Sequence, residues 1–110
     1  MAEKFYIKQN DTAPAIEVVL TDSNGRAKAL TQASTVKFNM STDTGERVVT
    51  LGTGAIVNSD RGIVSYTWQT GDTSNTGLHD AEFQVTYNNG QIETFPNDGY
   101  IKVIVKEELA

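Results

Sequence analysis

The chain has one histidine, His79, and no cysteine, so few side chains are available for nucleophilic catalysis or for binding a transition metal. In a Ser-His-Asp hydrolase, His79 would have to act as the base between a serine and a carboxylate. The sequence around it contains no Gly-x-Ser-x-Gly turn of the kind that exposes a nucleophilic serine. Zinc sites usually draw on several histidine and cysteine side chains. We therefore predict that His79 is a packing or corner residue at the start of a strand, with no catalytic or metal-binding role.

Two acidic turns contain the oxygen-bearing side chains that calcium prefers. They are Asp22-Ser23-Asn24-Gly25 and Asp43-Thr44-Gly45-Glu46. Neither matches the EF-hand loop, which needs a further acidic residue and a terminal glutamate. We favour a purely structural interpretation, because tight turns require Asp, Asn and Gly for backbone reasons. Paired carboxylates for glycoside hydrolysis depend on their separation in space, so the sequence leaves them open, although 110 residues offer little material for a deep cleft.

Four aromatic side chains would form a sugar-binding platform if they were exposed together: Trp68, Tyr66, Tyr87 and Tyr100. Their spacing argues against this for most of them. Tyr66 and Trp68 share a predicted strand face with Val64, and Tyr87 continues an apolar face of its own strand. We therefore interpret these aromatics as core residues, and the residues alone identify no ligand-binding position.

The length and charge of the chain restrict its class and its partners. We predict a single domain over residues 1–110, with residues 107–110 as a frayed tail. The net charge of −5 and the scattered Lys and Arg residues argue against a nucleic-acid partner. No stretch approaches about 18 consecutive apolar residues, and residues 1–4 contain no apolar signal region, so we predict no membrane insertion. Nothing in the sequence indicates a cofactor.

Apolar and polar residues alternate with period two along most of the chain, and turn residues separate the alternating runs. The runs predict about eight or nine short strands, over residues 5–8, 16–20, 36–41, 47–51, around 56, 64–68, 80–87, 92–95 and 100–106. Asn24-Gly25 and Asn89-Gly90 are typical of hairpin turns. Residues 31–34 are expected to form a helical turn. This spacing of short strands predicts an all-β, antiparallel sandwich or small barrel.

The segment Thr94-Phe95-Pro96-Asn97-Asp98-Gly99-Tyr100 separates the last two predicted strands. Pro96 has no backbone N–H and a fixed φ, so it is confined to a sheet edge or to a break between strands. The three residues after it are turn formers that reverse or offset the chain. The segment therefore predicts an interruption of the sheet, and we identify no active site in it.

Taken in order, several segments resemble the immunoglobulin-like N-terminal domain of phage baseplate upper proteins from siphophages of Gram-positive hosts. The resemblance covers nearly the whole chain and depends on the order of the segments, because turns and alternation recur in every sandwich. The segments include Ile7-Lys8-Gln9-Asn10-Asp11-Thr12-Ala13-Pro14, Leu20-Thr21-Asp22-Ser23-Asn24-Gly25, Val36-Lys37-Phe38-Asn39-Met40, Gly62-Ile63-Val64-Ser65-Tyr66, Gly77-Leu78-His79-Asp80-Ala81-Glu82-Phe83-Gln84-Val85 and the segment Thr94-Phe95-Pro96-Asn97-Asp98-Gly99-Tyr100.

The resemblance implies an immunoglobulin-like β-sandwich and departs from the family at one visible position. The family usually has tyrosine where this chain has His79. That position corresponds to the tyrosine corner, in which a hydroxyl ties a loop back to the backbone. An imidazole nitrogen could make a similar bond, so we expect the fold to tolerate the substitution.

The resemblance also implies a function without catalysis. A member of the family would be a structural module of the virion, made in the host cytoplasm, that docks on other tail or baseplate proteins and positions host-recognition parts. It would form homo-oligomers, because a sandwich has open sheet edges that neighbouring subunits can cover. The alternative is a carbohydrate-binding or host-surface adhesion module, and the sequence leaves direct contact with host carbohydrate open.

Overall fold

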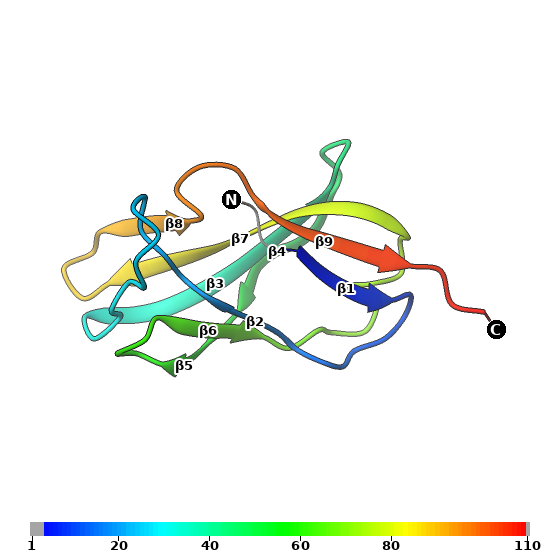
Figure 1. Ribbon diagram of the computed structural model, residues 1–110. Coiled ribbons are helices and arrows are strands. Elements are labelled where there is room, and N and C mark those ends of the chain that lie inside the picture. The colour runs from blue at the N-terminus through cyan, green and yellow to red at the C-terminus, as the bar shows by residue number, and fades with distance from the viewer. Residues whose placement is uncertain (1–3, 110) are drawn as a thin grey trace.

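The computed structural model describes residues 4–109, and every regular element in that range is a β-strand (Figure 1). The strands are β1 (Lys4–Lys8), β2 (Ile16–Val19), β3 (Ala33–Thr42), β4 (Arg47–Thr53), β5 (Ala55–Asn58), β6 (Ile63–Tyr66), β7 (Gly77–Tyr87), β8 (Ile92–Phe95) and β9 (Ile101–Lys106). The prediction of an all-β chain of eight or nine strands is confirmed. The described range excludes residues 1–3, which belong to the segment predicted to lack a signal region, and residue 110, which belongs to the predicted tail. Within that range, no helix is long and apolar enough to cross a membrane.

The strands form two sheets that pack face to face. The large sheet has the order β1-β9-β7-β3-β4, with β8 also paired to β7, and the small sheet has the order β2-β6-β5. All pairs are antiparallel except β1 with β9, which run parallel from Lys4 opposite Lys102 to Lys8 opposite Lys106. After β1 the chain crosses to β2 in the small sheet, and β9 is the last strand of the chain. No hairpin therefore joins β1 to β9, and a parallel pairing is possible.

The inward-facing residues of both sheets meet in one aromatic and aliphatic core. Phe38 of β3 is fully buried at its centre and stacks on Tyr66 of the small sheet, with ring centroids 4.5 Å apart. Phe83 of β7 lies 5.0 Å from the Phe38 ring, and Trp68 meets it edge-on at 5.6 Å. Alternation puts the neighbours of these residues on the outer faces, where side chains are free to form a polar surface.

The Phe95 to Tyr100 segment lies where two strands share one edge of β7. Strand β3 pairs with β7 along its other edge, from His79 to Tyr87. On the shared edge, β8 pairs with the part of β7 from Phe83 to Thr86, and β9 pairs with the part from Gly77 to Ala81. Pro96 follows the cis Phe95–Pro96 bond in the break between them, as predicted from its missing N–H.

Three local predictions differ from the structure. Residues 31–34 form no helix: the chain makes one turn, closed by the Ala33 N–H donating to the Leu30 carbonyl oxygen, and Ala33 and Ser34 already belong to β3. Strand β6 ends at Tyr66, so Trp68 reaches the core from the loop that follows. The Asn24-Gly25 turn closes only an isolated bridge between Thr21 and Ala27, with no strand after it.

Candidate functional site

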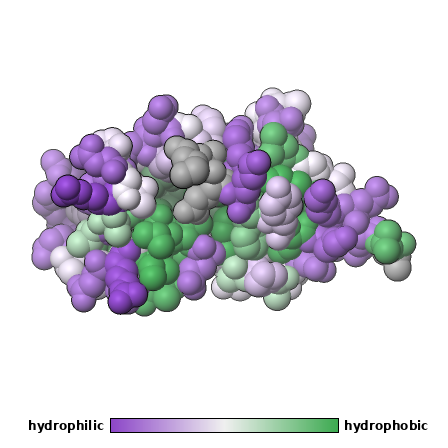
Figure 2. Space-filling view, in the orientation of Figure 1, coloured by the Kyte–Doolittle hydropathy of each residue, from purple (hydrophilic) through white to green (hydrophobic). Residues whose placement is uncertain are grey.

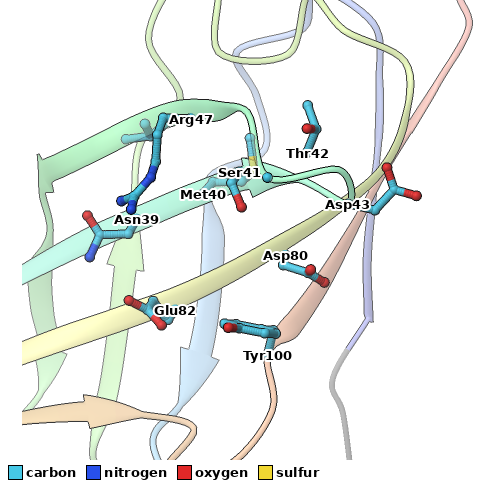
Figure 3. A pocket seen from close by; sticks show the side chains of 11 residues that line it. Asn39, Met40, Ser41, Thr42, Asp43, Arg47, Asp80, Glu82 and Tyr100 are labelled. Carbon is cyan, nitrogen blue, oxygen red and sulfur yellow. The ribbon is translucent and has the colours of Figure 1, made fainter.

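An open polar groove of about 300 Å³ lies on the outer face of the large sheet (Figure 3). Strands β3 and β7 form its floor, the turn between β3 and β4 forms one end, and Tyr100 stands at its side, just before β9. In Figure 3, Tyr100 lies on the β7 side with Asp80 and Glu82, and Arg47 extends from β4 on the opposite side. The volume is at the lower end of the range found for small-molecule sites.

The strand register brings the polar residues of the groove together. On the outer face, Asn39 lies directly opposite Glu82, and Ser41 lies directly opposite Asp80. Arg47 of β4 pairs with Ser41 from the other side of β3. Directly opposed side chains on one face of an antiparallel pair have Cβ atoms about 5 Å apart. Residues from three strands therefore form a contiguous polar cluster.

Lys102 of β9 organises the β7 side of this cluster. Its Nζ atom donates to Asp80 Oδ1 at 2.5 Å, in a pair whose side chains are 33% and 21% exposed. The same Nζ atom lies 5.8 Å from the centroid of the Tyr100 ring, within cation–π range. One lysine thus orients an acceptor carboxylate and the aromatic ring together. Tyr100 itself is 46% exposed.

Asn39 of β3 and Arg47 of β4 add hydrogen-bond donors to the groove. Asn39 Oδ1 accepts the Leu51 N–H at 2.7 Å, which fixes the amide plane across to β4. Its amide nitrogen and the guanidinium of Arg47 are donors, whereas Glu82 and Asp43 carry acceptor oxygens. Within residues 4–109, no group of three or more His, Cys, Asp or Glu side chains is arranged to hold a metal ion. The groove is therefore suited to hydrogen bonding with a ligand that has both donors and acceptors.

His79 lies in the core and is only 1% exposed, facing away from this groove. Its Nδ1 atom is 3.1 Å from the Gly77 carbonyl oxygen, so the imidazole does form a bond to the backbone. Among the described residues its Nε2 atom has no hydrogen-bond partner. This position agrees with the packing role predicted for the histidine.

The aromatic residues named from the sequence do not form one platform. Trp68 and Tyr66 are 2% and 4% exposed and belong to the core, as predicted from their strand face. Tyr87 is partly buried, and its hydroxyl donates to Glu93 Oε1 at 2.7 Å. Tyr100 is the exception, because it precedes β9 instead of occupying an inward position in the strand.

The two acidic turns have different surroundings. Asp22 Oδ1 accepts the backbone N–H groups of Asn24 and Arg26, which is the turn-stabilising role that we predicted. Asp43 lies in the turn at the end of the groove. Sequence reasoning did not select Asp80, Glu82 or Asn39, although their places in alternating runs indicated an outward orientation. The pairing of β3 with β7 brings these three residues together, and no sequence pattern near any of them predicts that pairing.

Two tyrosine hydroxyls, those of buried Tyr66 and partly buried Tyr87, donate to carboxylates, and we expect them to make folding sensitive to alkaline pH. Burial, followed by the hydrogen bond to Asp72, raises the pKa of Tyr66 well above that of an ordinary phenol. Burial, followed by the hydrogen bond to Glu93, also raises the pKa of Tyr87. The pKa of each hydroxyl is higher in the folded chain than in the unfolded chain. The protonated hydroxyls therefore stabilise the fold fully below the ordinary phenol pKa of 10.0, and this contribution is lost as the pH rises through the folded-state pKa.

We therefore expect the free energy of unfolding to decrease as the pH rises above about 10. Urea denaturation followed by far-ultraviolet circular dichroism, at about pH 9 and about pH 11, measures the decrease. The Tyr66→Phe/Tyr87→Phe double variant should show a smaller decrease than the wild-type chain. An equal decrease in both proteins would contradict the assignment.

The comparisons with known proteins identify a fold and no family. No protein-family model matches the chain, and no curated protein sequence matches it. Among solved structures, the chain is similar to CopC from Methylosinus trichosporium OB3b, with a TM-score of 0.57 and 11% identity, over 99% of this chain and 89% of that one. At this identity the likeness shows the fold alone. Residues 4–109 form an all-β, immunoglobulin-like β-sandwich of nine short strands.

Proposed function

We propose that this protein is a non-enzymatic structural module of a phage tail tip or baseplate. It works by docking on neighbouring tail proteins and on copies of itself. The ordered resemblance of its segments to baseplate upper proteins supports the tail assignment. The structural observation that carries the docking role is an apolar, open side of the sandwich beside strand β2.

The open side combines an edge strand with a small apolar hollow. Strand β2 is an edge of the small sheet, and Val19 at its end is 41% exposed. The hollow beside it has a volume of about 50 Å³ and is lined by Val18, Val19, Leu20, Thr21, Phe95, Pro96 and Ile101. Val19, Thr21 and Pro96 reach the surface, and the other four are buried beneath them. Figure 2 shows apolar side chains gathered over β2 on this face of the molecule. Phe95 and Pro96, which belong to the segment that resembles baseplate upper proteins, thus lie beside the β2 edge that we propose as the docking site.

The edge strands β4, β5 and β1 carry features that discourage strand pairing. Strand β4 has two register shifts against β3, and β5 has one against β6. Bulges of this kind twist an edge away from incoming strands. Strand β1 has Lys4 and Lys8 at its ends, and lysine on an edge has the same effect. Strand β2 pairs with β6 without a register shift, so its backbone is regular enough to receive another strand.

The test uses the proteins encoded beside this one, because tail genes are arranged in ordered blocks. The chain is co-expressed with the product of each flanking gene, and complexes are isolated by affinity purification and sized by light scattering. We expect a stable complex with at least one tail protein. Val19→Asp should abolish it without lowering the urea midpoint, because the side chain is already substantially exposed.

Val57→Asp is the matched control. Val57 is 52% exposed on β5, at the opposite edge of the same sheet, so the same charge is introduced away from the proposed contact. Complexes should survive this substitution. A strictly monomeric chain that binds no flanking tail protein would overturn the proposal, as would equal loss of binding in the two variants.

A further inference from the structure

The groove on the large sheet has no part in the docking proposal, because it lies on the opposite side of the large sheet from the small sheet. We propose that it is a binding site for a neutral saccharide. The proposal depends on the combination of one exposed aromatic residue, Tyr100, with donors and acceptors around it. It is independent of the tail assignment and of the β2 edge.

The aromatic component is Tyr100. Sugar rings have an apolar face of C–H groups that packs on an aromatic ring, and Tyr100 has about half of its surface exposed, at 46%. The ring is held from one side by the Lys102 ammonium, 5.8 Å from its centroid. Lys102 is itself anchored to Asp80, so the platform is oriented before a ligand arrives. Such preorganisation reduces the entropy lost on binding.

The polar component can bind hydroxyl groups, which donate and accept hydrogen bonds at once. Glu82 offers two acceptor oxygens directly across the strand pair from Asn39, whose amide nitrogen is a donor. Arg47 adds planar donors on the β4 side, and Asp43 adds acceptors at the turn. Neighbouring sugar hydroxyls are matched by planar groups that offer two sites each.

The charge pattern distinguishes a saccharide from the main competing ligand, a basic side chain of another protein. A lysine or arginine ligand would favour the three carboxylates of the groove, Asp43, Asp80 and Glu82. However, Lys102 already pairs with Asp80, and the Arg47 guanidinium partly offsets Asp43 and Glu82, so the groove offers both donors and acceptors and no purely anionic surface. A neutral ligand with many hydroxyls uses both kinds of group and meets no repulsion.

Nuclear magnetic resonance titration of the isotope-labelled chain tests the proposal. Glucose, galactose and N-acetylglucosamine are added separately at millimolar concentrations, and a tri-lysine peptide is the competing probe. We expect one or more of the sugars to shift backbone amides of residues 39–43, 80–82 and 100. Tyr100→Ala should weaken binding about tenfold or more, and Glu82→Gln should weaken it less, whereas Tyr100→Phe should retain it because the ring remains.

Tyr6→Ala is the matched control, because Tyr6 is also exposed and has Lys106 5.9 Å from its ring, but it does not line this groove. Sugar binding should be unchanged in this variant. The inference is overturned if none of the three sugars shifts the groove amides, if only the tri-lysine peptide does so, or if Tyr100→Ala binds as the wild type does. None of these outcomes bears on docking at β2, which Val19→Asp tests separately.

Discussion

Replacement of Phe38 by alanine is expected to lower the free energy of unfolding by about 3 to 5 kcal/mol. The side chain is 0% exposed and contacts three aromatic rings, those of Tyr66 in the small sheet, Phe83 in the large sheet and Trp68 in the loop after β6. Its removal leaves a cavity that the surrounding rigid rings cannot readily fill. Because small domains are typically stable by about 5 to 15 kcal/mol, this loss brings the chain close to unfolding.

Urea denaturation followed by far-ultraviolet circular dichroism measures this loss without relying on the fluorescence of Trp68, which the substitution itself alters. Ile92→Ala is the control. It also removes a large apolar side chain from a strand, but Ile92 is 60% exposed, so the change should be about 0.5 kcal/mol or less. Similar midpoints for the two variants would contradict the central position of Phe38.

Replacement of Gly62 by alanine is expected to cost about 2 to 5 kcal/mol, from two sources that add. Gly62 has φ of +68°, in the left-handed region that is unfavourable for residues with a Cβ atom. An added Cβ would also overlap the Lys28 carbonyl oxygen and approach that of Leu20 at 3.1 Å. Both carbonyls belong to backbone that cannot move freely, because Leu20 donates its N–H to Gly62 and accepts that of Lys28, each at 2.8 Å.

Gly25→Ala separates the two sources of this cost. Gly25 has φ of +80°, close to that of Gly62, but an added Cβ there has no atom within 4 Å. It should therefore cost only the conformational strain, about 1 to 2 kcal/mol. Thermal or urea denaturation of the two variants, measured side by side, gives the steric contribution as the difference. If Gly25→Ala proved as costly as Gly62→Ala, the close contact with the residue 20–28 segment would be wrong.

The structure retains most of the elements that local patterns predicted, and it differs where tertiary contacts decide. The alternating runs became strands with nearly the predicted bounds, and the Asn89-Gly90 turn closed the hairpin between β7 and β8. The prediction of a helical turn over residues 31–34 was wrong, because Ala33 pairs with Tyr87 and the polar composition of the segment gives no indication of this pairing. Trp68 was correctly assigned to the core, yet its strand ends two residues earlier.

The candidate groove was not predictable, for a related reason. Tyr100 and the acidic turn at Asp43 were noticed separately, but nothing near either residue points to the other. They meet because β7 pairs with β3 on one edge and with β9 on the other, and each register places specific outer residues opposite one another. Register is a long-range property that depends on which apolar faces pack together, so local alternation leaves it undetermined.

The sequence by itself determined the class of fold, the inward orientation of Trp68, Tyr66 and Phe83, and the break at Pro96. Each of these depends on short-range physics, namely the two-residue period of a strand and the missing N–H of proline. Only the tertiary structure showed that the Phe95 to Tyr100 break lies between two strands sharing one edge of β7. It alone placed Tyr100 beside Asp80 and Glu82, because packing of the two sheets selects one strand order and register among many that the same alternation permits.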